Sequence, residues 1–213
     1  KAALQDALRG RCERAGHGDR ASVVQTWMEA VLTTPLPSLG ASLPQLPTRL
    51  TEMEFWMPCE SLAATAVDAL CTRHLLGARP RPPLAQRTLH GMLMGFADLV
   101  FEHDRRYWVL DYKSNWLGDA GTAYDRDALE AAMAKHRYDV QAALYLLALH
   151  RLLRARLGKN YVPEQHLGGA LYFFVRGIDG PCKGEYALPA DDAMLELLAE
   201  LDRLLDGAAA VSC

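Results

Sequence analysis

Two strand-like apolar runs of this chain contain charged side chains in their interiors. Asp98 lies within residues 95–101 (GFADLVF), and Asp111 and Lys113 lie within residues 108–113 (WVLDYK). Strands of this composition normally carry their charges at the ends. A charge in apolar surroundings costs free energy unless a partner compensates it. We therefore expect a hairpin whose charges are compensated by one another or by a bound ion.

The numbering of the hairpin predicts which residues meet. If Asp104 and Arg105 form a two-residue turn, paired positions sum to 209, and Asp98 lies opposite Asp111. Opposed side chains have Cβ atoms roughly 4.5–5.5 Å apart, and like charges there repel. Lys113 lies on the same face because side chains alternate with a period of two. Asp-Arg is not a favoured hairpin turn, and a slip of one residue would send one carboxylate to the opposite face.

Two opposed carboxylates beside an amine have three interpretations. The group is a buried ion pair that holds the hairpin, a pair of acids that share a proton, or a site for a hard metal ion. Mg²⁺ and Mn²⁺ prefer carboxylate oxygens, and Mg²⁺ usually binds through one or two carboxylates plus substrate phosphates. A lysine on the same face would then position water or neutralise developing charge. We favour the metal site, and the spacing Asp-X12-Asp-X-Lys is the pattern of the PD-(D/E)XK nucleases.

Sequence blocks around this hairpin closely resemble the nuclease domain of RecB, the beta subunit of the bacterial helicase–nuclease exodeoxyribonuclease V. The blocks occur in the family's order and spacing and cover most of the chain: residues 52–55, 93–101, 110–118, 136–151 and 168–177. The resemblance implies an α/β fold of the restriction-endonuclease-like type. In that fold a mixed central sheet is flanked by helices, and here an N-terminal helical segment precedes it.

The resemblance also implies roles for residues of the hairpin. Asp98 and Asp111 match metal-binding acids, and the backbone carbonyl of Tyr112 matches a further metal ligand. Lys113 matches the catalytic lysine. Glu52 matches an acid on an earlier strand beside the metals, so that Asp111, Lys113 and Glu52 form the expected catalytic set. A solvent-facing strand residue is the alternative interpretation of Glu52.

A predicted helix after the hairpin supplies expected substrate-binding residues. Arg137, Gln141 and Tyr145 are spaced four apart and should share one helical face. Gln141 and Tyr145 match a Gln-X-X-X-Tyr motif of the family, and an amide and a phenol suit contacts with phosphate, water or bases.

Two alternatives stay open: Glu54 competes with Glu52 for the role of the upstream acid, and Trp116 either stacks on a base of single-stranded DNA or packs against the hairpin.

The implied activity is metal-dependent hydrolysis of double- and single-stranded DNA of the exodeoxyribonuclease V type, in double-strand-break repair and recombination. Mg²⁺ is the expected cofactor, with Mn²⁺ possible. RecC- and RecD-like subunits and an upstream helicase domain of the same polypeptide are the expected partners. The chain has no Gly-X-X-X-X-Gly-Lys sequence, so we expect no ATPase or helicase motif here.

One family feature has no counterpart in this sequence. The family has an upstream histidine metal ligand, and His17, His74 and His90 do not match its position. The chain also begins with Lys1 within a helical pattern. We therefore expect a fragment that lacks this ligand and is weakly active.

Composition limits the remaining classes of protein. The 213 residues are half hydrophobic, enough for one sizeable core. We expect residues 1–50 to form a helical segment with a proline-rich connection and residues 51–213 to form the nuclease core of the same domain. Five scattered cysteines show no disulfide or zinc spacing, so we predict reduced thiols, a cytoplasmic protein and no iron–sulfur cluster. No run of about eighteen apolar residues exists, and no membrane partner is expected.

Charge is distributed unevenly along the chain, whose net charge is −3. Residues 135–159 contain six basic residues against one acid, and residues 185–206 contain seven acids against one arginine. The basic stretch is either a solvated helix face or part of a DNA-binding surface. Two alternative functions stay open: a catalytically silent module that docks partner subunits through its acidic helix, and a hydrolase of another phosphodiester such as RNA.

Apolar periodicity predicts the order of the elements. Helices are expected near residues 2–16, 22–33, 61–76 and 125–157, the last broken near His136, and strands at 51–57 and 167–175. Asp191 is expected to cap a final amphipathic helix.

Overall fold

The computed structural model describes residues 2–46, 48–77 and 79–210. Its contacts divide the chain into two compact units, Lys1–Leu46 and Pro47–Cys213. The boundary lies close to the one expected at residue 50, and the assignment of both units to one domain stays a prediction.

The first unit is helical, as the sequence predicts. It contains α1 (Ala2–Arg14), η1 (Gly18–Arg20), α2 (Ala21–Thr33) and η2 (Leu43–Gln45). The amide of Gln5 in α1 donates to Glu29 in α2 at 3.1 Å. The proline-rich connection contains the short helix η2, because Ser42 and Gln45 form a capping box that stabilises it there.

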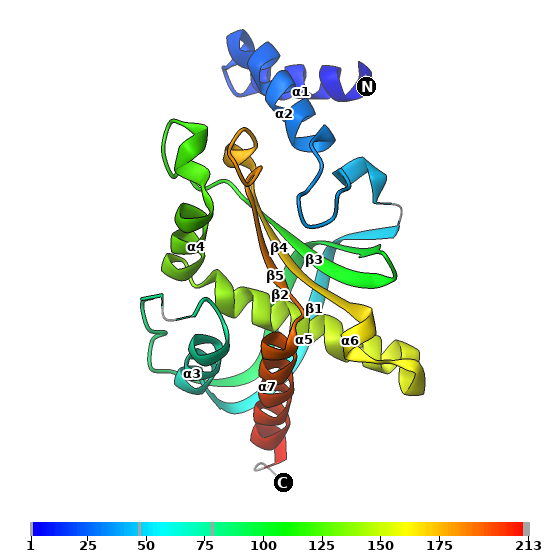
Figure 1. Cartoon of the computed structure of the whole chain (residues 1–213), viewed down its shortest axis with the longest axis vertical. Coiled ribbons are helices and arrows are strands. Elements are labelled where there is room, and N and C mark those ends of the chain that lie inside the picture. Colours follow the sequence, from blue (N-terminus) through cyan, green and yellow to red (C-terminus); the bar gives the residue numbers. More distant parts are fainter. Residues whose placement is uncertain (1, 47, 78, 211–213) are drawn as a thin grey trace. The chain divides into compact units, whose positions relative to one another are not determined.

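The second unit is built on a five-stranded mixed sheet (Figure 1). Its strands, in spatial and chain order, are β1 (Thr48–Ala63), β2 (Thr88–His103), β3 (Arg106–Lys113), β4 (Leu167–Phe174) and β5 (Glu185–Pro189). β3 and β4 are parallel, and the other neighbours are antiparallel. Every residue of β4 is buried, as expected for an apolar strand with a neighbour on each side. The expected mixed sheet flanked by helices is therefore confirmed.

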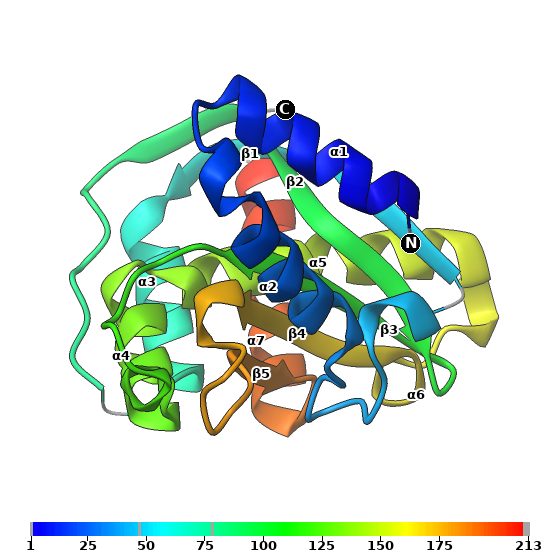
Figure 2. The same ribbon diagram turned by 90° about the horizontal axis from the view of Figure 1, so that it is seen from above.

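Two long helices cover one side of this sheet (Figure 1 and Figure 2). They are α5 (Tyr138–Leu157) and α7 (Asp192–Ala210), and their apolar residues form one core cluster with residues of the strands. Asp191 caps α7 as predicted, because its carboxylate accepts the Met194 N–H at 3.0 Å. The remaining helices are α3 (Ala64–His74), α4 (Arg126–Lys135), α6 (Pro163–His166) and the short turns η3 (Gly121–Tyr124), η4 (Gly158–Asn160) and η5 (Val175–Gly177). None of the described helices is long and apolar enough to cross a membrane.

The two charged stretches of the sequence meet between these helices. Arg151 of α5 contacts Asp202 at 2.6 Å and Asp206 at 2.7 Å, and Arg154 contacts Asp202 at 2.7 Å. Ion pairs with arginines of α5 therefore offset part of the negative charge of α7. These pairs involve two of the six basic residues in the basic stretch.

Candidate active site

The β2–β3 turn has the register that the numbering predicts. Asp104 and Arg105 have positive φ angles of 50° and 62°, as a type I′ turn requires at both central residues. The ladder pairs His103 with Arg106 and continues to Leu99 opposite Leu110, so paired positions sum to 209. Although Asp-Arg is not the favoured turn sequence, the two-residue hairpin forms.

Asp98 and Asp111 occupy the next positions of this register. A carboxylate oxygen of Asp98 accepts the Tyr112 N–H at 2.8 Å, so the side chain reaches across to β3. Asp111 is 4% exposed, and burial is the main cause of a raised pKa for its carboxyl group. The charge of Asp98 raises the pKa of Asp111 further, while Lys113 lowers it. The two acids therefore share one electrostatic environment.

The Lys113 ammonium group is held beside these acids by several contacts. Its Nζ lies 2.6 Å from Oδ2 of Asp111 and donates to Oε1 of Gln141 at 2.9 Å. The same atom lies 3.9 Å from the centroid of the Tyr138 ring and 5.3 Å from that of Tyr172, within the range of cation–π attraction. The lysine is therefore fixed by an acid, an amide and two aromatic rings.

The first turns of α5 bring Gln141 and Tyr145 to the same place. The amide nitrogen of Gln141 donates to the Tyr145 hydroxyl at 2.7 Å, and the Tyr172 hydroxyl donates to the amide oxygen of Gln141 at 3.2 Å. Tyr145 also hydrogen-bonds to Asp111. Burial, followed by the charge of Asp111, raises the pKa of Tyr145 to about 12. Tyr145 is therefore a neutral hydrogen-bond donor at physiological pH.

Comparison with known proteins identifies the family of this chain. The model of the PD-(D/E)XK nuclease superfamily matches residues 2–212. The chain belongs to this superfamily. It is 45% identical over 184 residues to the RecBCD enzyme subunit RecB of Escherichia coli (strain K12). The matched region makes up 84% of this chain and 16% of that protein. It is 34% identical over 186 residues to RecB of Haemophilus influenzae. This match makes up 84% of the chain and 15% of that protein.

These similarities confirm the resemblance to the nuclease domain of RecB. The chain spans about one sixth of the length of the curated relatives it matches.

Glu52 falls between two paired positions of the β1–β2 ladder. This ladder pairs Thr51 with Leu99 and Met53 with Ala97, which leaves Glu52 opposite Asp98. Glu52 is exposed and has a positive φ of 52°, so the backbone departs from regular strand geometry there. The neighbouring Glu54 instead accepts the indole N–H of Trp56 at 3.0 Å. Position therefore favours Glu52 over Glu54 as the upstream acid, and its catalytic role stays a prediction.

Arg137 does not share the face of Gln141 and Tyr145, which corrects the expectation from spacing. It has a left-handed φ of 55° and precedes the first residue of α5, because the break after α4 falls at this position. Its guanidinium contacts Asp68 at 2.6 Å and Asp139 at 3.1 Å. Asp139 also pairs with Arg81 at 2.9 Å. The structure therefore favours a structural role for Arg137 over substrate binding.

The oxygen atoms at this site are of the chemical type that binds a divalent cation such as Mg²⁺. Asp98, Asp111 and the carbonyl of Tyr112 supply oxygen ligands, and Mg²⁺ commonly takes one or two carboxylates and completes its shell with water and phosphate oxygens. Among the described residues no group of three or more His, Cys, Asp or Glu side chains is suited to hold a metal ion. A site here therefore depends on these two acids, and Lys113 competes with the cation for Asp111 in this arrangement.

Tyr138 and Tyr172 are site residues that the sequence reasoning missed. Tyr172 pairs with Asp111 in the parallel β3–β4 ladder, so its place could be found only once β3 and β4 were known to be neighbours. Tyr138 precedes Gln141 by three residues, a helical spacing that could have placed it on the same face. The two rings stack with centroids 5.6 Å apart.

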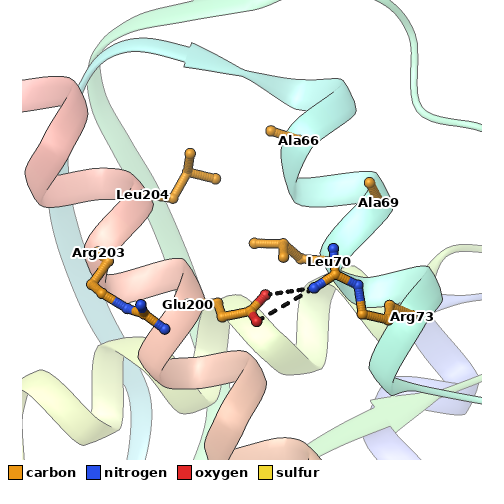
Figure 3. A pocket seen from close by; sticks show the side chains of 7 residues that line it. All are labelled: Ala66, Ala69, Leu70, Arg73, Glu200, Arg203 and Leu204. Atoms are coloured by element: carbon orange, nitrogen blue, oxygen red, sulfur yellow. Dashed lines mark hydrogen bonds and ion pairs between the residues drawn. The ribbon is translucent and has the colours of Figure 1, made fainter.

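A groove between α3 and α7 is a separate feature (Figure 3). Arg73 and Glu200 form an ion pair at 3.2 Å across it, and Leu70 and Leu204 contribute apolar surface. It contains none of the predicted site residues, so it does not compete as the candidate active site.

Proposed function

We propose that this chain is the Mg²⁺-dependent DNA nuclease domain of a RecB-like helicase–nuclease subunit, and that Mn²⁺ can replace Mg²⁺. The reaction is hydrolysis of DNA phosphodiester bonds in double-strand-break repair and recombination. The observation that carries the proposal is the convergence of Asp98, Asp111 and Lys113 where the C-terminal end of β3 lies beside the interior of β2, in a chain that belongs to a nuclease superfamily.

The proposed residues divide the work between binding and chemistry. Asp98, Asp111 and the carbonyl of Tyr112 would hold the cation, which when bound supplies Lewis acidity toward a phosphate oxygen and a bound water. Lys113 orients the attacking water and offsets negative charge that develops on the phosphoryl oxygens. Glu52 adds a carboxylate beside Asp98.

Residues of α5 would keep this arrangement in place. Gln141 and Tyr145 form a hydrogen-bonded chain between Lys113 and Asp111, so they fix both groups before substrate arrives. Once a phosphate is bound, the amide and the phenol are suited to contact its oxygens. This arrangement supports their assignment to substrate binding.

The proposed partners follow from the relatives, which are named as subunits of the RecBCD enzyme. We propose that this chain acts with RecC- and RecD-like subunits and with a helicase domain of the same polypeptide. Double- and single-stranded DNA are the proposed substrates. A net charge of −3 is compatible with DNA delivered by other modules, because the chain has fewer basic residues (23) than acidic ones (26).

Cleavage of DNA by charge-neutral variants tests the proposal. Asp111→Asn and Asp98→Asn should each lower the rate of hydrolysis of a linear DNA strand in Mg²⁺ by at least about 100-fold, the order expected when transition-state charge stabilisation is lost. Asp104→Asn, in the turn at the other end of β3, serves as the matched control and should cleave normally. Normal cleavage by Asp111→Asn would refute the proposal.

The alternative of a silent docking module has less support. Its acidic helix α7 already pairs Asp202 and Asp206 with arginines of α5. The RNA alternative is separated by comparing cleavage of DNA and RNA strands of the same sequence. Preference for RNA would replace the DNA assignment.

A further inference from the structure

The segment that follows β3 presents an exposed tryptophan close to the candidate active site. Trp116 lies three residues after Lys113 and is 64% exposed. Within the described ranges 2–46, 48–77 and 79–210 it makes no hydrogen bond and no ring contact. A single exposed aromatic side chain is common on protein surfaces, so its surroundings must decide whether it has a function.

The backbone on both sides of Trp116 is anchored. The hydroxyl of the buried Tyr124 donates to the Asn115 carbonyl at 3.2 Å and accepts the Leu117 N–H at 3.2 Å. The side chain of Asn115 accepts the Tyr138 hydroxyl at 3.2 Å. The indole is therefore held on a fixed segment, which lowers the entropy that a bound ligand would have to offset.

Arg176 lies beside this segment in η5, directly after β4. β3 and β4 are parallel, and their ladder ends with Lys113 opposite Phe174. The segments that follow these two strands therefore leave the sheet at the same edge. Nε of Arg176 donates to the Ser114 carbonyl at 2.9 Å. In the part of the chain that the structure describes, Arg176 forms no ion pair, and the guanidinium is exposed. Its remaining nitrogens are available to an anion.

We propose that Trp116 and Arg176 form a binding site for single-stranded DNA at this edge of the sheet. Trp116 stacks on an unpaired base, and the free nitrogens of Arg176 contact a backbone phosphate. The inference rests on the proposed nuclease function and adds a strand contact next to its acid pair. A single strand is the expected occupant because a base inside a duplex does not offer its face to an indole.

Binding of a fluorescein-labelled 12-nucleotide strand, measured by anisotropy in EDTA to prevent cleavage, tests this site. Trp116→Ala should weaken binding at least about fivefold, and Trp116→Phe should restore most of the affinity because it keeps an aromatic face. Arg176→Ala should weaken binding and reduce the slope of log affinity against log salt concentration by about 1, as expected for one lost phosphate contact.

Matched controls lie elsewhere on the same sheet. Trp56 of β1 is 56% exposed, and Arg105 lies in the turn at the opposite end of β3. Trp56→Ala and Arg105→Ala should bind the strand like the unaltered chain. Unchanged binding by Trp116→Ala, or an equal loss with Trp56→Ala, would overturn the assignment of the site.

Cleavage measured in parallel separates this inference from the proposed function. If the unaltered chain cleaves DNA, Asp111→Asn does not, and Trp116→Ala binds normally, only the stacking site is wrong. If the unaltered chain neither binds nor cleaves DNA, both the stacking site and the nuclease assignment fail.

Discussion

At the scale of single residues, the position of Lys113 depends on the Tyr138 ring as well as on Asp111. The ammonium lies 3.9 Å from the ring centroid, and a partly desolvated cation–π contact contributes about 0.5–2 kcal/mol. Tyr138→Leu should therefore slow single-turnover DNA cleavage about 2- to 30-fold with little change in DNA affinity. Tyr138→Phe keeps the ring and should cleave at nearly the normal rate. An equal loss in both variants would instead assign the effect to the hydroxyl that bonds Asn115.

Arg137 provides a contrasting prediction because its contacts are structural. Asp139 is fully buried between Arg137 and Arg81, and removal of one partner from a buried ion pair costs roughly 3 kcal/mol. Arg137→Ala should lower the free energy of unfolding by about this amount in denaturant titrations. Cleavage per folded molecule should be retained. Full stability with lost DNA binding would restore the substrate-binding interpretation.

At the scale of elements, the ion pairs between α5 and α7 connect the two helices that cover the sheet. Burial alone would raise the pKa of Asp202, but hydrogen bonds from Arg154 and Arg151 outweigh it, and the net pKa is lowered below 3.8. Asp202→Asn should reduce the free energy of unfolding at neutral pH by roughly 1–3 kcal/mol.

The pH dependence of that difference has a definite sign. A carboxyl group with a lowered folded pKa stabilises the fold above its unfolded pKa and loses this contribution as pH falls through the folded value. The gap in stability between the unaltered chain and Asp202→Asn should therefore be constant near pH 7 and shrink below about pH 4. A gap that widens in acid would show that the ion pairs do not stabilise this interface.

Elements with a strong local sequence pattern could be predicted from the sequence. Elements whose position depends on contacts with distant segments could not. The β2–β3 register follows from two apolar runs and a turn of fixed length, and the cap at Asp191 from a local motif. The short strand β5 was not predicted, because its pairing with β4 and the burial of Tyr186 and Leu188 in the core depend on distant segments. Helix α3 begins at Ala64 and not near residue 61, because Leu62 and Ala63 still pair with β2.

At the scale of the whole molecule, the candidate site could be predicted because its acids and lysine lie within 16 residues of sequence. The network around Arg137 could not be, because Asp68 and Arg81 come from segments that only the fold brings near. The charge distribution was visible in the sequence, but the pairing of Arg151 and Arg154 with α7 was not. Helical spacing alone therefore assigned Arg137 to the wrong surface.

We infer that Asp98 and Asp111 together bind a divalent cation between β2 and β3. Calorimetric titration with Mn²⁺ tests it most directly, with Glu54→Gln as a control that removes a nearby acid outside the proposed site. We expect Mn²⁺ to bind to the unaltered chain and to Glu54→Gln. The Mn²⁺ affinity of Asp98→Asn and of Asp111→Asn should fall at least about tenfold, because each substitution removes one of the two charged ligands. Equal Mn²⁺ affinity in all four proteins would contradict it.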